Sequence, residues 1–235
     1  MITILKEKNF DNEKPVHKTI LLENEFQTWL ICGMTKSGKT ESLFRTLLPK
    51  LMNPDCVFIV GKHKEQSIYK SIVEFFEKVT KIDNIKFIED VNDVPSYMSI
   101  EKLKDTKNNI CIFDDLDESK QGIRNPIVTS LFTAGRHLKM NTILCHQNYY
   151  EVPKTIRRNL TGLAIFNMSS GLDVIYRDIK SFFESPAEYN EYVKNVIQAG
   201  DYSFLWLTFG NCRQILRKRK NFDLINEQDY RKYYT

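Results

Sequence analysis

Short apolar runs alternate with longer stretches of helical spacing along most of this chain. The runs are typical of buried strands, and they occupy residues 29–32, 56–60, 85–88, 110–113, 142–145 and 163–166. Apolar residues recur at helical spacing in 39–48, 66–79, 126–138, 172–183 and 187–199, and a polar helical stretch is expected near 94–103. Strands that alternate with helices favour a mainly parallel central sheet flanked by helices, an α/β fold.

Both ends of the chain depart from this alternation. Residues 202–209 and 212–219 form two strand-like runs joined at Gly210-Asn211, which is typical of a β-hairpin. Residues 1–24 show no firm period and are expected to form an N-terminal arm or strand. We therefore expect a single domain over residues 25–235, which includes the C-terminal hairpin and a basic tail.

Composition narrows the class of protein. The chain has 235 residues, enough for one α/β core, and its five cysteines occur singly, without the paired spacing of a zinc site. They are expected to be small core residues in a reducing compartment. The sequence shows neither a basic leader nor an apolar run near the ~18 residues of a membrane helix, so we expect an intracellular protein that is not secreted.

Positive charge is concentrated in two places, although the formal net charge is only +4. One cluster lies between residues 134 and 160 and the other between 213 and 220. Such patches fit a polyanion. Solvated faces, or a charged edge strand that discourages aggregation, are the alternative.

Residues 33–40 form a complete phosphate-binding loop, Gly-Met-Thr-Lys-Ser-Gly-Lys-Thr, between the expected strand 29–32 and helix 39–48. Glycines let the backbone N–H groups face a phosphate, Lys39 supplies charge to the β- and γ-oxygens, and Thr40 can hold Mg²⁺. The sequence therefore predicts an ATP and Mg²⁺ site lined by Gly33, Met34, Thr35, Lys36, Ser37, Gly38, Lys39, Thr40 and Glu41.

Two carboxylates follow the apolar run 110–113, about seventy residues beyond this loop. A buried central strand delivers such acids to the carboxyl edge of the sheet, where ligands bind. We expect Asp114 to order Mg²⁺ beside Thr40 and Asp115 to polarise the attacking water. Glu118 is a fallback base if Asp115 is too short to reach.

The strand 142–145 ends in His146 and Gln147. If this strand lies between the other two, the Gln147 amide meets the aspartates and can sense the γ-phosphate. Side chains alternate along a strand, so His146 is expected to be packed or hydrogen-bonded rather than a base.

Three arginines are candidates for the cation that stabilises a transferring phosphoryl group, often from a neighbouring subunit: Arg136, Arg157 and Arg158. For each of them, a surface or DNA-facing role is the alternative.

Taken together, these motifs resemble the genome-packaging ATPases of poxviruses, other large DNA viruses and virophages, within the FtsK/HerA group of P-loop motors. The likeness rests on residues 33–40, 110–115, 135–147, 153–159 and 199–202. It implies a RecA-like core of the ASCE class, with the Gln147 strand between the other two. It also implies a ring, hexameric or pentameric, that drives double-stranded DNA into a preformed capsid, in the host cytoplasm or associated with the virion. Asp115 departs from the group, because much of it has Glu there.

Other functions remain open from the residues alone. One is a different P-loop machine, such as a helicase, a loader or a small-molecule kinase, although a kinase gives no reason for Gln147 and the basic patches together. Another is a nucleotide-gated scaffold protein with slow ATP turnover that docks on a capsid or on a membrane-associated partner. Turnover that is linear in protein and indifferent to DNA would favour the kinase or the scaffold protein.

Overall fold

The computed structural model describes residues 26–43, 55–61, 69–70, 85–98, 102–103, 105–106, 108–168, 171–180, 183, 185–197, 203–209, 215–220 and 223–224. The expected arm 1–24, most of the expected helix 66–79, the turn at Gly210-Asn211 and the basic tail lie outside these residues. The division into an arm and one domain therefore stays a prediction.

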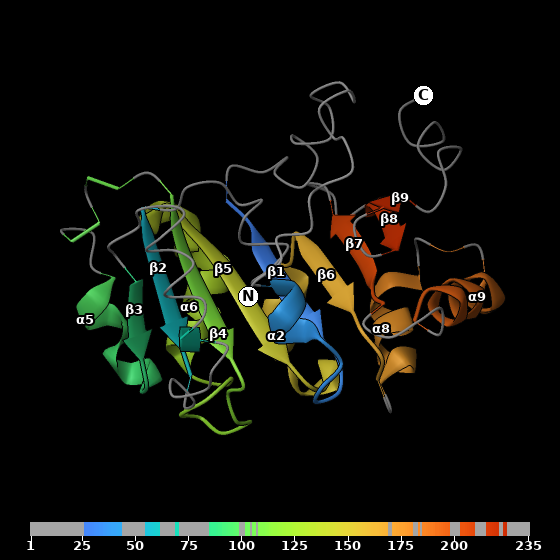
Figure 1. The fold of residues 1–235 in the computed structure, drawn as a ribbon, viewed down its shortest axis with the longest axis horizontal. Coiled ribbons are helices and arrows are strands. Elements are labelled where there is room, and N and C mark those ends of the chain that lie inside the picture. Colours follow the sequence, from blue (N-terminus) through green and yellow to red (C-terminus); the bar gives the residue numbers. More distant parts are fainter. Residues whose placement is uncertain are drawn as a thin grey trace.

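The described strands form one nine-stranded sheet in the order β3-β2-β4-β5-β1-β6-β7-β8-β9 (Figure 1). The first six in this order are parallel, and β7, β8 and β9 continue the sheet antiparallel. Their bounds are β1 Thr28–Cys32, β2 Cys56–Val60, β3 Ile85–Ile88, β4 Asn109–Asp114, β5 Met140–His146, β6 Gly162–Ile165, β7 Leu205–Phe209, β8 Ile215–Lys220 and β9 Asp223–Leu224.

The expected mainly parallel α/β fold is thus confirmed, and each of the first six strands matches an apolar run of the sequence to within three residues. β7 and β8 pair antiparallel, as the two arms of a hairpin do, although the turn between them is outside the described residues. The short strand β9 was not expected.

The order of the central strands decides where the site lies. β5 pairs with β1 on one side and with β4 on the other, both in parallel. Opposite Cys32 at the end of β1 lies His146, and opposite Asp114 at the end of β4 lies Cys145. The carboxyl ends of all three strands therefore meet at one edge of the sheet, the lower edge in Figure 1.

The core consists of two apolar clusters, one on each face of the sheet. Successive side chains of a strand point to opposite faces, so Leu30 and Cys32 belong to one cluster while Trp29 and Ile31 belong to the other. The first cluster takes buried residues from α5 Val94–Tyr97, α6 Pro126–Ala134, α7 Lys154–Arg158, α8 Leu172–Ile179 and α9 Pro186–Ile197. The second takes Leu43, next to α2 Lys39–Ser42, and Tyr69.

The helices expected near 94–103 and over 126–138, 172–183 and 187–199 are present at these places, with different lengths, whereas residues 44–48 of the helix expected over 39–48 lie outside the description. α5 is shorter than the expected 94–103, because Met98 already lies at φ −111° and ψ 35°, outside the helical region. α6 begins as expected at Pro126, where Asn125 accepts a hydrogen bond from the Ile127 N–H at 2.9 Å. After α6 the chain tightens into the 3₁₀ helix η5 Gly135–Leu138. Two other short 3₁₀ helices are η4 Val91–Asp93 and η6 Tyr149–Glu151.

The described cysteines fit the sequence prediction, since Cys32, Cys111 and Cys145 are buried and free and Cys56 is half-buried and free. Among the described helices, none is long and apolar enough to cross a membrane.

Candidate active site

The phosphate-binding loop joins β1 to α2 at the carboxyl edge of the sheet. The Gly33 N–H donates to the His146 carbonyl at 3.3 Å, and the Met34 N–H donates to the Asn167 carbonyl at 2.9 Å. A Cβ on Gly33 would lie 2.5 Å from the Phe166 Cβ, so this close approach requires glycine. Gly38 adopts φ 93°, a left-handed conformation that side chains other than glycine rarely allow. The backbone geometry therefore requires glycine at both positions.

The rest of the loop faces solvent. Met34, Thr35 and Lys36 are exposed, Ser37 and Thr40 are half-buried, and the side chain of Glu41 lies outside the description. An exposed loop tip between two tethered ends is suited to wrap a ligand's phosphates.

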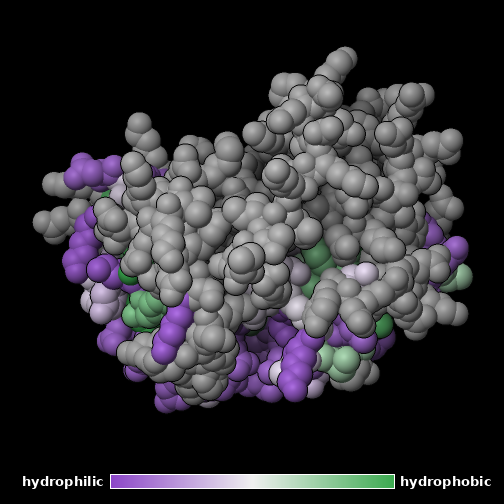
Figure 2. All heavy atoms as spheres, in the orientation of Figure 1, coloured by the Kyte–Doolittle hydropathy of each residue, from purple (hydrophilic) through white to green (hydrophobic). Residues whose placement is uncertain are grey.

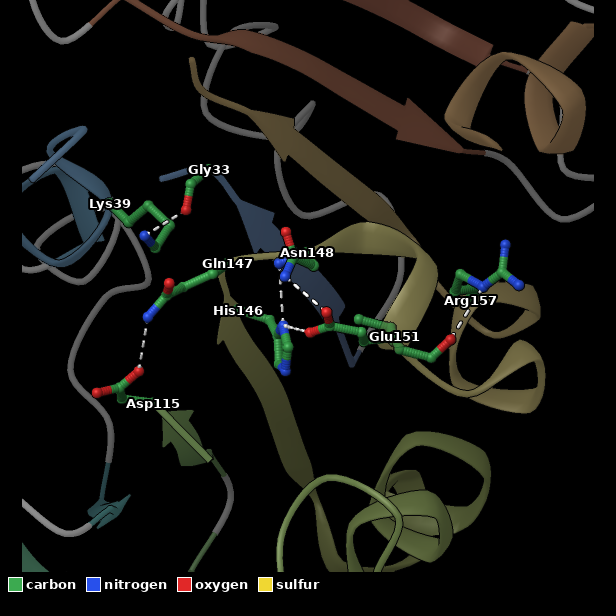
Figure 3. Close-up of polar contacts among 9 residues, drawn as sticks. Gly33, Lys39, Asp115, His146, Gln147, Asn148, Glu151 and Arg157 are labelled. Carbon is green, nitrogen blue, oxygen red and sulfur yellow. Dashed lines mark hydrogen bonds and ion pairs between the residues drawn. The ribbon is translucent and has the colours of Figure 1, made fainter. Parts of the chain in front are cut away.

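Lys39 is the half-buried cation of the loop, whereas Lys36 is exposed. Its Nζ donates to the carbonyl oxygens of Gly33 at 2.6 Å and Met34 at 2.8 Å, so the side chain curls back over the loop, as Figure 3 shows for Gly33. Burial lowers the pKa of the Lys39 ammonium from its ordinary value, while the carboxylates of Asp114 and Asp115 oppose this shift. A partly desolvated ammonium in this position attracts a phosphate more strongly than one in bulk water.

Thr40 and Asp114 lie side by side. The Thr40 Oγ1 donates to Asp114 Oδ2 at 3.4 Å, and the Tyr69 hydroxyl donates to the same oxygen. Asp114 is 7% exposed, and burial raises the pKa of its carboxyl group, whereas the hydrogen bond from Tyr69 lowers it. A buried carboxylate beside a hydroxyl gains from a hard cation that neutralises its charge.

The Thr40 hydroxyl and the Asp114 carboxylate fit Mg²⁺ as a pair of oxygen ligands. The part of the chain that the structure describes holds no group of three or more His, Cys, Asp or Glu that could bind a metal ion alone. Mg²⁺ in nucleotide sites takes only one or two protein ligands, and phosphate oxygens and waters complete its shell. Thr40 and Asp114 therefore suit an ion that arrives with the nucleotide.

Asp115 and Gln147 are in contact across the ends of β4 and β5. The Gln147 Nε2 donates to Asp115 Oδ1 at 3.3 Å, and both side chains are exposed at the edge of the sheet (Figure 3). Asp115 adopts φ 54°, a left-handed conformation that Asp and Asn tolerate better than most residues. The expected meeting of Gln147 with the aspartates is therefore present.

His146 is packed and hydrogen-bonded, in line with the sequence-based expectation. It is 6% exposed, its Nδ1 accepts from the Asn148 N–H at 3.1 Å, and Glu151 Oε2 lies 3.7 Å from the same nitrogen. The Asn148 Nδ2 donates to Glu151 Oε1 at 2.6 Å. Burial lowers the pKa of the His146 imidazole, so the ring is neutral near pH 7. This small network fixes the turn that follows Gln147.

Glu118, the fallback base of the sequence analysis, lies on the exposed loop after Asp115. Partial desolvation and the nearby Glu151 carboxylate raise the pKa of the Glu118 carboxyl group, and the Arg124 guanidinium opposes this shift. Figure 2 shows hydrophilic side chains gathered along this lower edge, and the exposed loop residues 117–121 belong to it.

The three arginines occupy different surroundings. Arg157 forms an ion pair with Asp178, donates from Nε to the Val152 carbonyl at 3.0 Å, and places its guanidinium 5.1 Å from the centre of the Tyr149 ring. These contacts bind Arg157 into its own chain.

Arg136 and Arg158 are exposed. Arg136 lies in η5, just before β5 begins, and therefore at the opposite edge of the sheet from the phosphate-binding loop. It lines a hollow of about 490 Å³ together with residues from α6, β5 and the chain after α7, among them Leu131, Met140 and Asn159. Seven residues of β5 separate the two edges, a span of about 20 Å at the usual strand rise.

Sequence reasoning missed three residues of this neighbourhood: Tyr69, Glu151 and Asp178. Tyr69 lies inside an apolar stripe of helical spacing, which gives no sign of a polar contact. Glu151 is the single acid within the basic cluster between residues 134 and 160. Its contacts depend on a turn that local spacing does not predict. An acid at residue 178, twenty-one positions from Arg157, has no local signature either.

A family comparison decides the class of the protein. The profile described as "Poxvirus A32 protein" matches residues 13–183, which is most of the chain. This chain belongs to the poxvirus A32 protein family. The match spans the phosphate-binding loop, both aspartates, Gln147 and all three arginines. The resemblance seen in the sequence is confirmed, and the A32-family chain is an ATPase of the viral genome-packaging kind.

Individual proteins are also similar to this chain. The A32-family chain is 28% identical over 189 residues to "Uncharacterized protein 075L" of Invertebrate iridescent virus 6, which covers 76% of this chain and 69% of the relative. Among solved structures, it resembles the genome packaging NTPase B204 from Sulfolobus turreted icosahedral virus 2 in complex with AMPPCP. That match has a TM-score of 0.59 and 18% identity, and it covers 84% of this chain and 97% of B204.

A further similar structure is the pCW3 conjugation coupling protein TcpA with ATPγS, at a TM-score of 0.53 and 13% identity, covering 90% of this chain and 66% of TcpA. At such identities the likeness to B204 and TcpA shows the fold, a RecA-like P-loop core.

Proposed function

We propose that this A32-family protein hydrolyses MgATP to drive double-stranded DNA into a preformed viral capsid, in the host cytoplasm during assembly, and that it works as a ring. One observation carries the proposal: Asp115 and Gln147 touch at the edge of the sheet where Lys39 and the Thr40–Asp114 pair also lie. The site thus holds a water-activating acid and a phosphate-sensing amide within reach of one phosphate-binding loop.

Each residue has a separate proposed task. The loop N–H groups and Lys39 hold the β- and γ-phosphates, and Thr40 and Asp114 hold Mg²⁺, which neutralises phosphate charge when bound. Asp115 orients and deprotonates the attacking water. The Gln147 amide can donate either to Asp115 or to the γ-phosphate, so its hydrogen-bond partner changes with the bound nucleotide.

The position of Arg136 supports chemistry between subunits. Because it lies about 20 Å from its own phosphate-binding loop, at the other edge of the sheet, it reaches only a nucleotide bound to a neighbour. A contact of one edge with the opposite edge of the next copy is heterologous, and such contacts form a ring when the rotation between copies closes. We propose a pentamer or hexamer with Arg136 acting in trans; Arg157 holds Tyr149 and α8 in place, and Arg158 faces DNA or the neighbour.

DNA contact is assigned to the basic clusters near residues 154–158 and 213–220. Lysine and arginine contacts to phosphate do not depend on base sequence, as a translocating motor requires. A capsid-vertex protein is the proposed docking partner of the assembled ring.

Steady-state ATP hydrolysis against protein concentration tests the function, with and without long duplex DNA. We expect turnover to rise more than linearly with protein, because the site needs a neighbour, and to be stimulated several-fold by DNA. Lys39→Ala is the blank. Turnover that is linear in protein and indifferent to DNA would contradict the proposal and favour a kinase or a scaffold protein.

Mixing two inactive variants tests the trans arginine. Arg136→Ala keeps the phosphate-binding loop and Lys39→Ala keeps the arginine, so mixed rings should recover part of the ATPase activity that each variant lacks alone. Arg177→Ala serves as a matched control, since Arg177 is exposed on α8 and lies 3.9 Å from Asp173; it should retain activity by itself. A mixture as inactive as its components would remove Arg136 from this role.

A further inference from the structure

Asp114 needs hydrogen-bond donors in the absence of a metal ion, because its carboxyl group is almost fully buried. Two described side chains donate to its Oδ2. Thr40 does so at 3.4 Å, near the limit of a hydrogen bond, whereas the Tyr69 hydroxyl makes a close contact. Tyr69 is therefore the stronger of these two restraints on the direction of the carboxylate.

Tyr69 is itself held firmly. The residue is 5% exposed and belongs to the apolar cluster that contains Ile59 and Ile112 of the neighbouring strands. Its ring packs edge-on against Phe87 of β3, with 5.9 Å between ring centres and 80° between ring planes. Burial and the nearby Asp114 raise the pKa of the Tyr69 hydroxyl, so it stays protonated and donates.

The end of β2 lies close to the backbone of Asp114. The Gly61 N–H at the end of β2 donates to the Ile88 carbonyl at 3.0 Å, and a Cβ on Gly61 would lie 2.6 Å from the Asp114 carbonyl oxygen. Glycine at this point lets β2 end directly against Asp114. Gly61 and Tyr69 thus both lie against Asp114, Gly61 at its backbone carbonyl and Tyr69 at its carboxylate.

We propose that Tyr69 is a positioning residue for the metal site: its hydroxyl holds the Asp114 carboxylate beside Thr40, ready for the cation of the bound nucleotide. The inference rests on the proposed function, since it deepens the Thr40–Asp114 site. Tyr69 is not assigned any contact with ATP.

The test compares the affinity for ATPγS in Mg²⁺ with the affinity in EDTA, measured by calorimetry. The ratio of these two affinities isolates the contribution of the metal ion. Tyr69→Phe keeps the ring and its packing on Phe87 and removes only the hydroxyl. We expect the ratio to fall roughly tenfold, the scale of a hydrogen bond to a charged group, with metal-free affinity unchanged.

Control variants and a second assay of Tyr69→Phe complete the comparison. Tyr97→Phe removes a hydroxyl from an exposed tyrosine of α5 and should leave the ratio unchanged. Asp114→Asn should abolish most of the metal effect, and adding Tyr69→Phe to it should cause little further loss, because both changes act on one interaction. In ATPase assays, Tyr69→Phe should raise the Mg²⁺ concentration for half-maximal turnover while kcat at saturating Mg²⁺ stays within about threefold.

A purely structural tyrosine would behave differently. An equal loss of ATPγS affinity with and without Mg²⁺, or an unchanged ratio, would overturn the role of Tyr69. If the unmodified protein bound ATPγS equally well in Mg²⁺ and in EDTA, the metal site of the proposed function would fail first, and this inference with it.

Discussion

Asp115→Asn should reduce ATP turnover by at least about a hundredfold while ATPγS affinity stays within about twofold, because the change removes a proton acceptor and no ligand of the nucleotide. The substitution is well matched to its place in the structure. Asparagine tolerates the φ of 54° at this position, and its side-chain oxygen can still accept the hydrogen bond from Gln147. Turnover and binding are measured on the same preparation.

Asp117→Asn is the matched control, two residues further along the same exposed loop. Asp117 Oδ1 accepts from the Ser119 N–H at 3.0 Å, a contact that asparagine can keep. It should leave turnover nearly unchanged. Unaltered turnover in Asp115→Asn would remove Asp115 from its role and direct the search for the base to Glu118, with Glu118→Gln as the next variant.

Lys39→Ala should weaken ATP binding by at least about a hundredfold and leave no measurable turnover. The loop would lose the ammonium that partly buried surroundings make effective against the β- and γ-oxygens. The Gly33 and Met34 N–H groups still donate to the carbonyls of His146 and Asn167, so the folded loop should survive the loss of the ammonium with little change in melting temperature. Nucleotide titration and thermal unfolding measure the two effects.

Lys36→Asn provides the comparison for charge alone. Lys36 is exposed in the same loop at φ 64°, a conformation that asparagine adopts readily. A change in ATP affinity of less than about fivefold is expected. If Lys36→Asn were as damaging as Lys39→Ala, general attraction by positive charge would explain binding, and the specific role of Lys39 would be lost.

Short-range sequence patterns predicted the parts of this fold that depend on residues close together along the chain. The strand before Gly33 and the start of α6 at Pro126 are examples, because burial periodicity and helix capping act over a few residues. Lengths were harder to predict. α5 ends at Tyr97 rather than near residue 103, since the end of a short helix depends on what the following chain packs against.

Strand order was expected from the family resemblance and not from spacing. No local signal says that β5 enters between β1 and β4, yet this insertion places Gln147 against Asp115. The pairing of strands far apart in sequence is a tertiary event, decided by the packing of the whole sheet.

By itself, the sequence determined the chemistry of the phosphate-binding loop, the acids at the end of β4 and the α/β class, because these depend on residue type and short-range spacing. Only the tertiary structure decided which side chains meet. It brought the Tyr69 hydroxyl, which lies in an apolar stretch of the sequence, within hydrogen-bond distance of Asp114, and it paired Arg157 with Asp178 within the chain. It also placed Arg136 at the far edge of the sheet. These outcomes depend on contacts between residues distant along the chain, which hydrophobic periodicity and short-range motifs do not encode.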